Sequence, residues 1–124
     1  MKIVEIQSYN EFKNINSNYK LSFIQIGATW CGPCKKIKPL IEEYMKNLEE
    51  NDIVFIKIDY DELEEDEELK ELIKVEKLPY ITIYNKIKCD EGKSTGDFEE
   101  MKKYIENKLE KKEELNKLEM EDDF

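Results

Sequence analysis

Residues 21–35 read LSFIQIGATWCGPCK, an apolar run followed at once by a pair of cysteines, Cys31 and Cys34. The apolar, β-branched character of residues 21–26 predicts a strand that is buried on both faces. From Pro33 onward, apolar residues return at steps of three and four, which predicts an amphipathic helix. The two cysteines are therefore expected where a buried strand passes into the first turn of a helix.

This position predicts the chemistry of the two thiols. At a helix start, Cys31 meets unpaired N–H groups and the positive end of the helix dipole, which favour a thiolate. The CxxC setting also lowers a thiol pKa from about 8.5, so part of Cys31 is expected to be nucleophilic at neutral pH. Cys34 lies one turn deeper on the same helical face, within reach of a mixed disulfide at Cys31. We expect Cys31 to attack and Cys34 to resolve, with Pro33 stiffening the loop and Gly32 leaving room for a substrate.

Two other interpretations of the cysteine pair are weaker. A structural zinc site needs four N or S ligands, but the chain has no His and one further cysteine, Cys89. An inert buried pair is the other alternative, and the strand-to-helix junction argues against it. We therefore expect no bound metal or cofactor, and a redox-active disulfide between Cys31 and Cys34. Cys89, on a predicted edge strand, is interpreted as a small apolar filler, with a regulatory mixed disulfide as the alternative.

The composition indicates the setting in which the protein works. The 124 residues fit one domain, and their net charge of −10 repels nucleic acid and anionic membranes. The N-terminus lacks a secretory-signal pattern, and no segment approaches the roughly 20 apolar residues that span a bilayer. Three cysteines, two of them in a CxxC, suit a reducing compartment. We expect a cytoplasmic monomer that binds neither nucleic acid nor membranes.

The rest of the chain alternates between strand and helix patterns. Besides residues 21–26, strands are expected at residues 3–6, 53–58, 81–84 and near 87–89. The last two are close enough to form an antiparallel hairpin, with its turn either at Asn85-Lys86 or at Asp90-Glu91-Gly92. Helices are expected after caps at Ser8 and Asp97, from Pro33, and as one helix around residues 69–73. This order predicts an α/β fold with a single central mixed sheet of about five strands, flanked by about four helices.

With these features in place, the sequence resembles the thioredoxin family. The resemblance covers roughly residues 1–109 and is carried by WCGPCK at residues 30–35, Ala28, Pro39, the Leu78-Pro79 dipeptide and Gly96. Leu78-Pro79 resembles the cis-proline loop of the family, and Gly96 the glycine before its last helix. The six-residue run is highly specific, whereas the other matches are supporting features.

The resemblance implies a thioredoxin fold and reduction of protein disulfides by dithiol exchange. It implies that Trp30 shapes the substrate surface and that Pro79 packs opposite the CxxC in cis. Electrons are expected from a flavoprotein reductase that draws on NADPH, which gives the protein a part in electron transport and cell redox homeostasis. Residues 1–110 would form the thioredoxin-like domain, and residues 111–124 a charged extension, helical or disordered. A weakly active or redox-inert interaction module with the same fold is the alternative function.

Three departures from the family pattern bear on that alternative. Gln25 stands six residues before Cys31, where the family usually carries a buried Asp that exchanges a proton with the resolving thiol. An amide cannot do so, and Gln25 is either a satisfied buried amide or the sign of an altered mechanism. The segment between Asp59 and Pro79 is longer and strongly acidic, and the C-terminus is extended. The acidic run at residues 61–71 is interpreted as a solvated helix face, with a docking surface for a basic partner as the alternative.

Overall fold

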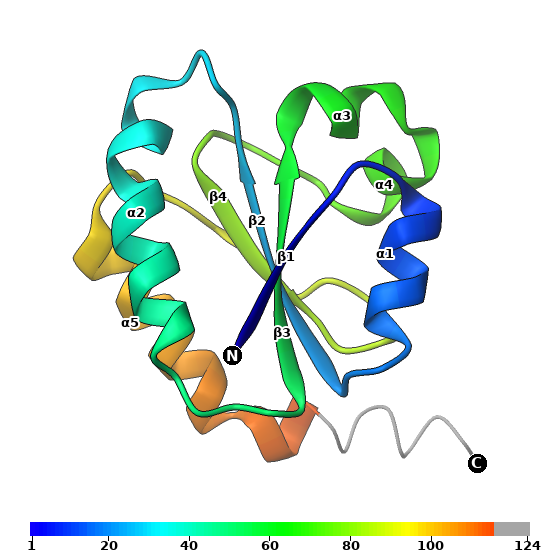
Figure 1. Cartoon of the computed structure of the whole chain (residues 1–124), viewed down its shortest axis with the longest axis vertical. Helices are drawn as coiled ribbons and strands as arrows, with labels where there is room; N and C mark the ends of the chain where they lie inside the picture. The colour runs from blue at the N-terminus through cyan, green and yellow to red at the C-terminus, as the bar shows by residue number, and fades with distance from the viewer. Residues whose placement is uncertain (116–124) are drawn as a thin grey trace.

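The computed structural model describes residues 1–115, and residues 116–124 of the predicted extension lie outside them. The strands are β1 (Lys2–Ile6), β2 (Leu21–Gly27), β3 (Ile53–Asp59), β4 (Tyr80–Tyr84) and β5 (Lys93–Ser94). The helices are α1 (Tyr9–Asn16), α2 (Gly32–Lys46), α3 (Tyr60–Glu65), α4 (Glu67–Leu72) and α5 (Phe98–Glu110). The strands form one sheet in the order β1-β3-β2-β4-β5, with helices on both faces (Figure 1). The predicted α/β architecture is confirmed, with five helices where about four were expected.

The sheet is mixed because its strands pair in both senses. β3 pairs in parallel with β1 and β2, whereas β4 pairs antiparallel with β2 and β5. In the parallel register Gly27 lies opposite Asp59. The carboxyl ends of β2 and β3 therefore share one edge of the sheet, the edge at which open α/β sheets place their sites.

The two faces of the sheet bury separate apolar cores. In Figure 1, α2 and α5 lie on one side of the sheet, and α1, α3 and α4 lie on the other. Alternate residues of β2 supply both cores, since Phe23 packs on the α2–α5 side while Ile24 and Ile26 pack on the opposite side. This explains the continuous apolar run of β2. No helix within residues 1–115 has the length and apolar character needed to cross a membrane.

Two predicted helix caps are confirmed. The Ser8 hydroxyl oxygen accepts a hydrogen bond from the Glu11 N–H at 3.2 Å, at the start of α1. The Asp97 carboxylate accepts one from the Glu99 N–H at 3.1 Å, at the start of α5. Each bond satisfies a backbone donor that the first helical turn would otherwise leave unpaired.

The helix predicted around residues 69–73 is confirmed as α4, but the acidic segment before it forms a further short helix, α3, which was not predicted. The break falls at Asp66, whose Oδ1 accepts a hydrogen bond from the Leu69 N–H at 3.1 Å and caps α4. Its second carboxylate oxygen, Oδ2, accepts from the Tyr9 N–H of α1 at 2.8 Å. Asp66 therefore ends one helix, starts the next and links both to α1.

The strand predicted near residues 87–89 is also wrong. The chain reverses at the first of the two proposed turns: Asn85 Oδ1 accepts from the N–H groups of Ile87 and Lys88, each at 3.0 Å, and Lys86 has a φ of 78°. These bonds hold residues 85–88 in the turn, so Cys89 forms only an isolated bridge with Tyr84. The antiparallel hairpin itself is confirmed, but its second strand is β5, four residues further on.

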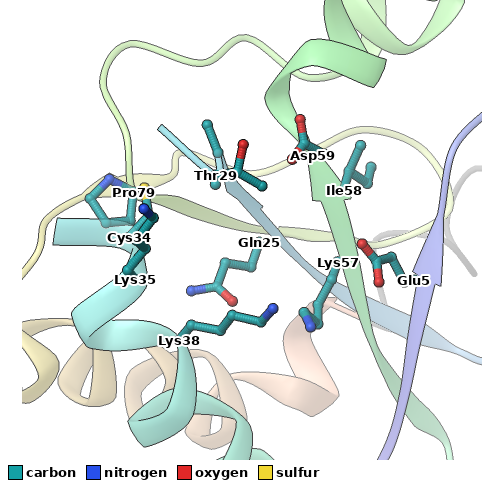
Figure 2. A pocket seen from close by; sticks show the side chains of 12 residues that line it. Glu5, Gln25, Thr29, Cys34, Lys35, Lys38, Lys57, Ile58, Asp59 and Pro79 are labelled. Carbon is teal, nitrogen blue, oxygen red and sulfur yellow. The ribbon is translucent and has the colours of Figure 1, made fainter. Parts of the chain in front are cut away.

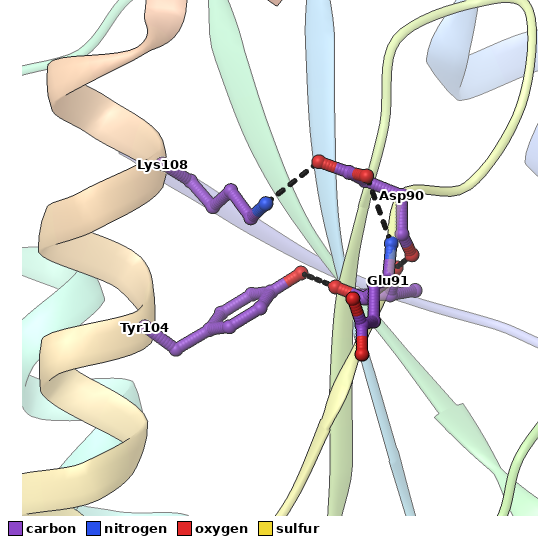
Figure 3. Close-up of polar contacts among 5 residues, drawn as sticks. Asp90, Glu91, Tyr104 and Lys108 are labelled. Carbon is purple, nitrogen blue, oxygen red and sulfur yellow. Dashed lines mark hydrogen bonds and ion pairs between the residues drawn. The ribbon is translucent and has the colours of Figure 1, made fainter.

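Two side chains of helix α5 bond to the segment between Cys89 and β5 (Figure 3). The Tyr104 hydroxyl donates to the Glu91 carbonyl oxygen at 2.8 Å, and the Lys108 ammonium pairs with Asp90 at 2.6 Å. Gly92 passes so close to Tyr80 that a Cβ at this position would lie 2.2 Å from the tyrosine ring. The close approach explains why glycine occupies position 92.

The chain beyond α5 packs back onto the domain. Lys112 pairs with Glu50 at 3.1 Å and with Asp52 at 2.7 Å, two residues of the connection between α2 and β3. Leu115 is buried in the same core as α2 and α5. The α2–α5 core therefore continues four residues past Lys111.

Candidate active site

Cys31 and Cys34 form a disulfide at the start of α2. Their Cα atoms are 5.3 Å apart, and their exposed fractions are 8% and 6%. Cys31 is the cap residue of α2, and its Sγ accepts a hydrogen bond from the Cys34 N–H at 3.3 Å. The predicted position at a strand-to-helix junction is confirmed. Negative charge that develops on Cys31 Sγ would meet a backbone donor and the positive end of the α2 dipole.

The two cysteines open into different hollows of the surface. Cys31 lines a groove of about 360 Å³, together with Trp30, Tyr60 and residues 75–78. Cys34 lines a cavity of about 330 Å³ on the other side of the disulfide, together with Gln25, Lys57, Asp59, Pro79 and their neighbours (Figure 2). One sulfur therefore belongs to an outer groove and the other to an inner cavity.

Trp30 forms a wall of the groove and is held by the start of α3. The Trp30 indole N–H donates to Asp61 Oδ1 at 3.3 Å, and the indole ring meets the Tyr60 ring edge-on with centroids 6.2 Å apart. A hydrogen bond to Glu64, with smaller contributions from burial and nearby carboxylates, raises the pKa of the Tyr60 hydroxyl. The indole is nevertheless 62% exposed, so it offers a fixed apolar surface next to Cys31.

Pro79 lies at the inner side of the disulfide. The Leu78–Pro79 peptide bond is cis, as the family resemblance implies. Leu78 lines the groove of Cys31, and Pro79 lines the cavity of Cys34. A Cβ on Gly96 would lie only 3.0 Å from Pro33, so glycine lets the chain pass close to Pro33, next to Pro79.

Gln25 is buried below Cys34, on the strand where the sequence predicts it. It is 7% exposed, and its amide nitrogen donates to the Met101 sulfur at 3.7 Å, a weak contact. Lys57 lines the same cavity and forms an ion pair with Glu42 of α2. The cavity thus holds a buried neutral amide and a paired lysine.

The third cysteine lies outside both hollows. Cys89 is partly buried in the core on the α1 side of the sheet. Burial raises the pKa of its thiol to about 12. Within residues 1–115, no group of three or more His, Cys, Asp or Glu side chains is arranged to hold a metal ion.

Several residues of this site were not predicted from the sequence. Tyr60 and Asp61 approach Trp30 although they are 30 and 31 residues away along the chain. Asp59 and Lys57 reach the cavity of Cys34. Their position within or directly after a buried strand could have indicated that they belong to the site. Since the carboxyl ends of adjacent parallel strands meet, the residues that follow β3 should lie beside those that follow β2.

Comparison with known proteins agrees with this geometry. The thioredoxin family model matches residues 2–111. A thioredoxin from Coprinus comatus is 33% identical over 79 residues, which cover 64% of this chain and 72% of that protein. Thioredoxin 1 of Plasmodium falciparum is 45% identical over 65 residues, which cover 52% of this chain and 59% of that protein.

The similarity extends to solved structures. The structure of Plasmodium falciparum thioredoxin superposes with a TM-score of 0.70 at 33% identity, covering 86% of this chain and 98% of that one. The sequence match to a thioredoxin from Schizosaccharomyces pombe, like that to the Plasmodium protein, spans only 59% of the relative's length. The family match nevertheless covers nearly the whole chain and includes both cysteines. The chain therefore belongs to the thioredoxin family of thiol–disulfide oxidoreductases.

Proposed function

We propose that this protein reduces disulfides of other proteins by dithiol exchange through Cys31 and Cys34. The observation that carries the proposal is the placement of the two sulfurs in different hollows. Cys31 lines the outer groove, which an incoming polypeptide can enter, and Cys34 lines the inner cavity. A substrate disulfide therefore meets Cys31 first.

The exchange then runs in two displacements. In the reduced protein, the Cys31 thiolate attacks one sulfur of the substrate disulfide, forming a mixed disulfide and releasing the other substrate sulfur as a thiolate. Cys34 gives up its proton and attacks Cys31 Sγ, which breaks the mixed disulfide and releases the second substrate thiolate. The substrate gains two electrons and two protons, and the protein is left with the Cys31–Cys34 disulfide.

The surrounding residues support these steps. Trp30 and Leu78 line the groove in which the substrate lies, and Gly32 and Pro33 form the first turn of α2. The positive end of α2 and the Cys34 N–H stabilise the Cys31 thiolate, both before attack and as a leaving group. Gln25 has no titratable proton, so Cys34 must lose its proton to water or to another group in the cavity that Pro79 also lines.

The partners and setting follow from the same chemistry. The oxidised pair must be reduced elsewhere, and we assign this step to a flavoprotein reductase that draws on NADPH, as the family membership suggests. A dithiol cycle needs a reducing compartment, which favours the cytosol. We also propose that residues 1–110 form the redox domain, that residues 111–124 are an extension, and that the protein works as a monomer.

Turnover of insulin tests the proposed activity. Reduced protein should accelerate the reduction of insulin by dithiothreitol, measured as the precipitation of the free B chain. The Cys31→Ser variant should lose this acceleration, because no thiol then faces the groove. Equal rates for the unmodified protein and the variant would show that the fold is kept for a role other than disulfide reduction.

A further inference from the structure

The groove beside Cys31 has an aromatic wall that is open to solvent. Trp30 and Tyr60 line it, and the indole of Trp30 is 62% exposed. The Asp61 carboxylate and the Tyr60 ring fix the orientation of the indole. The face of a tryptophan ring is the aromatic surface that attracts an ammonium or guanidinium group most strongly. A cationic side chain therefore has a place to lie close to the attacking sulfur.

Carboxylates next to this wall retain uncompensated charge. Glu76 lines the groove, and Asp61 accepts the indole N–H of Trp30. Within residues 1–115 neither of these carboxylates forms an ion pair, whereas Glu64 and Glu71 pair with lysines of α4 and the segment after it. Aromatic surface and unpaired carboxylates favour the same kind of ligand, and they do so independently.

The wider charge around the groove has the same sign. Residues 59–77, which supply four of the residues that line the groove, contain ten acidic and three basic residues. This is a net charge of −7 in a chain whose total is −10. Among the residues that line the groove, the charges of Glu76 and Lys77 balance. The negative potential at the groove therefore comes from Asp61, beside Trp30, and from the acidic segment around it.

We propose that this groove selects protein disulfides that have an arginine or lysine beside one of the two substrate cysteines. The cation would lie over the Trp30 ring and next to Glu76 while the substrate sulfur meets Cys31. Glu76 and Asp61 are then residues that determine specificity, and acidic neighbours of a disulfide are repelled. The inference rests on the proposed disulfide reduction and adds a substrate class to it, without changing the exchange chemistry.

Three synthetic peptides test the proposal. Each carries one disulfide in the same apolar sequence, with Arg, Gln or Glu next to the cysteine. Pre-reduced full-length protein in excess is mixed with each peptide, and the second-order rate of peptide reduction is followed by chromatography, which removes any need for a donor. We expect the order Arg, Gln, Glu, with a difference of about fivefold or more between the first and last. The difference should shrink in about 0.5 M salt, because exposed charges are screened.

A pair of matched variants separates the groove from the overall charge. Glu76→Gln should lower the ratio of the Arg to the Glu peptide by about twofold or more. Glu110→Gln makes the same charge change at the C-terminal end of α5, at a residue that does not line this groove, and should leave the ratio unchanged. Equal rates for the three peptides, or equal ratios in the two variants, would overturn the assigned substrate class while disulfide reduction stands. Failure to reduce any of the peptides would overturn the proposed function as well.

Discussion

Gln25 and Lys57 are direct partners in the parallel register of β2 and β3, and both side chains line the cavity of Cys34. Figure 2 shows them on neighbouring strands, with Gln25 between Cys34 and Lys57 in this view. Lys57 pairs with Glu42 of α2 instead of with its strand partner, since an amide carries no charge. The cavity thus combines a lysine and a neutral amide at the place where a proton must leave Cys34.

Gln25→Asp should therefore speed turnover near neutral pH. A carboxyl group at this position is desolvated, so its pKa lies above the usual value near 3.9 and it can accept the Cys34 proton. General-base assistance is typically worth about 10²-fold or more, and it should act on resolution of the mixed disulfide and leave the first attack unchanged. Single-turnover kinetics of the two steps measure this. Equal or slower resolution in the folded variant would mean that water or another cavity residue already serves Cys34.

The same variant should be less stable at neutral pH. Burying an ionisable group without a prepared partner costs on the order of a few kcal/mol. Since folding raises the pKa of such a carboxyl, the cost is close to zero below the unfolded pKa, grows as the pH rises from the unfolded to the folded pKa, and is constant above the folded pKa. Denaturation of both proteins at about pH 4 and pH 7 separates this effect on stability from the effect on rate.

Cys34→Ser should trap substrates. Cys31 can still attack, but no second thiol is present to break the mixed disulfide. A column of this variant should retain proteins from a lysate that dithiothreitol releases, and Cys31→Ser should retain few. The order of attack would be reversed if the Cys31→Ser column held the larger set.

Cys89→Ser should leave turnover within about twofold, because a thiol that stays protonated is not a nucleophile. Its pKa, raised to about 12 by burial, keeps Cys89 protonated across the physiological range. Insulin turnover tests the variant, and slow alkylation of Cys89 in a Cys31→Ser, Cys34→Ser protein tests the cause. A large loss of turnover would make Cys89 a functional thiol.

Lys112→Gln should lower the free energy of unfolding at neutral pH but leave it unchanged in strong acid. Burial works to raise the pKa of Asp52, but the hydrogen bond and charge of Lys112 outweigh it, so the pKa lies below its ordinary value. Stability from such a carboxyl is complete above the unfolded pKa near 3.9 and is lost as the pH falls through the lower folded pKa.

Chemical denaturation at about pH 7 and about pH 2 measures the effect of this change. The loss should be about 1 kcal/mol or less at neutral pH, because the pair is partly exposed, and close to zero in acid. Lys103, which is exposed and forms no ion pair within residues 1–115, provides the control Lys103→Gln. A loss of the same size at both pH values would exclude the charge of Asp52 as its cause.

Gly92→Ala should destabilise the hairpin by about 1–3 kcal/mol. The added methyl group would lie 2.2 Å from the ring of Tyr80, which is buried and cannot move aside freely. Gly32→Ala is the matched control, since a Cβ there meets nothing within 4 Å. Thermal unfolding of the two variants compares them, and equal midpoints would show that the hairpin relaxes around the methyl group.

The parts of the fold that could be predicted from the sequence are those determined by residues adjacent in the chain. The strand β2 and its cysteines could be predicted because an apolar run and a helix start are properties of adjacent residues. The caps Ser8 and Asp97 were predictable for the same reason. The cis peptide bond at Pro79 could be predicted only from the family resemblance, because a single proline indicates no more than a turn or a strand start.

The errors arose where one side chain selects between local structures that the sequence allows equally. The glutamates and leucines around Asp66 favour a helix. The break falls at Asp66 because its side chain caps α4 at Leu69 and also accepts from Tyr9 of α1, far away in the sequence. Both candidate turns of the hairpin contain good turn residues, and the side chain of Asn85 selects between them. Tyr60 and Asp61 belong to the site through the pairing of β2 with β3, which is a property of the sheet as a whole.

The hydrogen bond from the Cys34 N–H to Cys31 Sγ makes one backbone amide a built-in reporter of the redox state. In the oxidised protein the acceptor is a neutral disulfide sulfur, whereas in the reduced protein it is a sulfur that carries negative charge when ionised. A charge-assisted bond is shorter and stronger, so the resonance of this single amide proton should shift as the pair is reduced. Titrating a ¹⁵N-labelled sample against a dithiol buffer would then read the midpoint potential without any added probe.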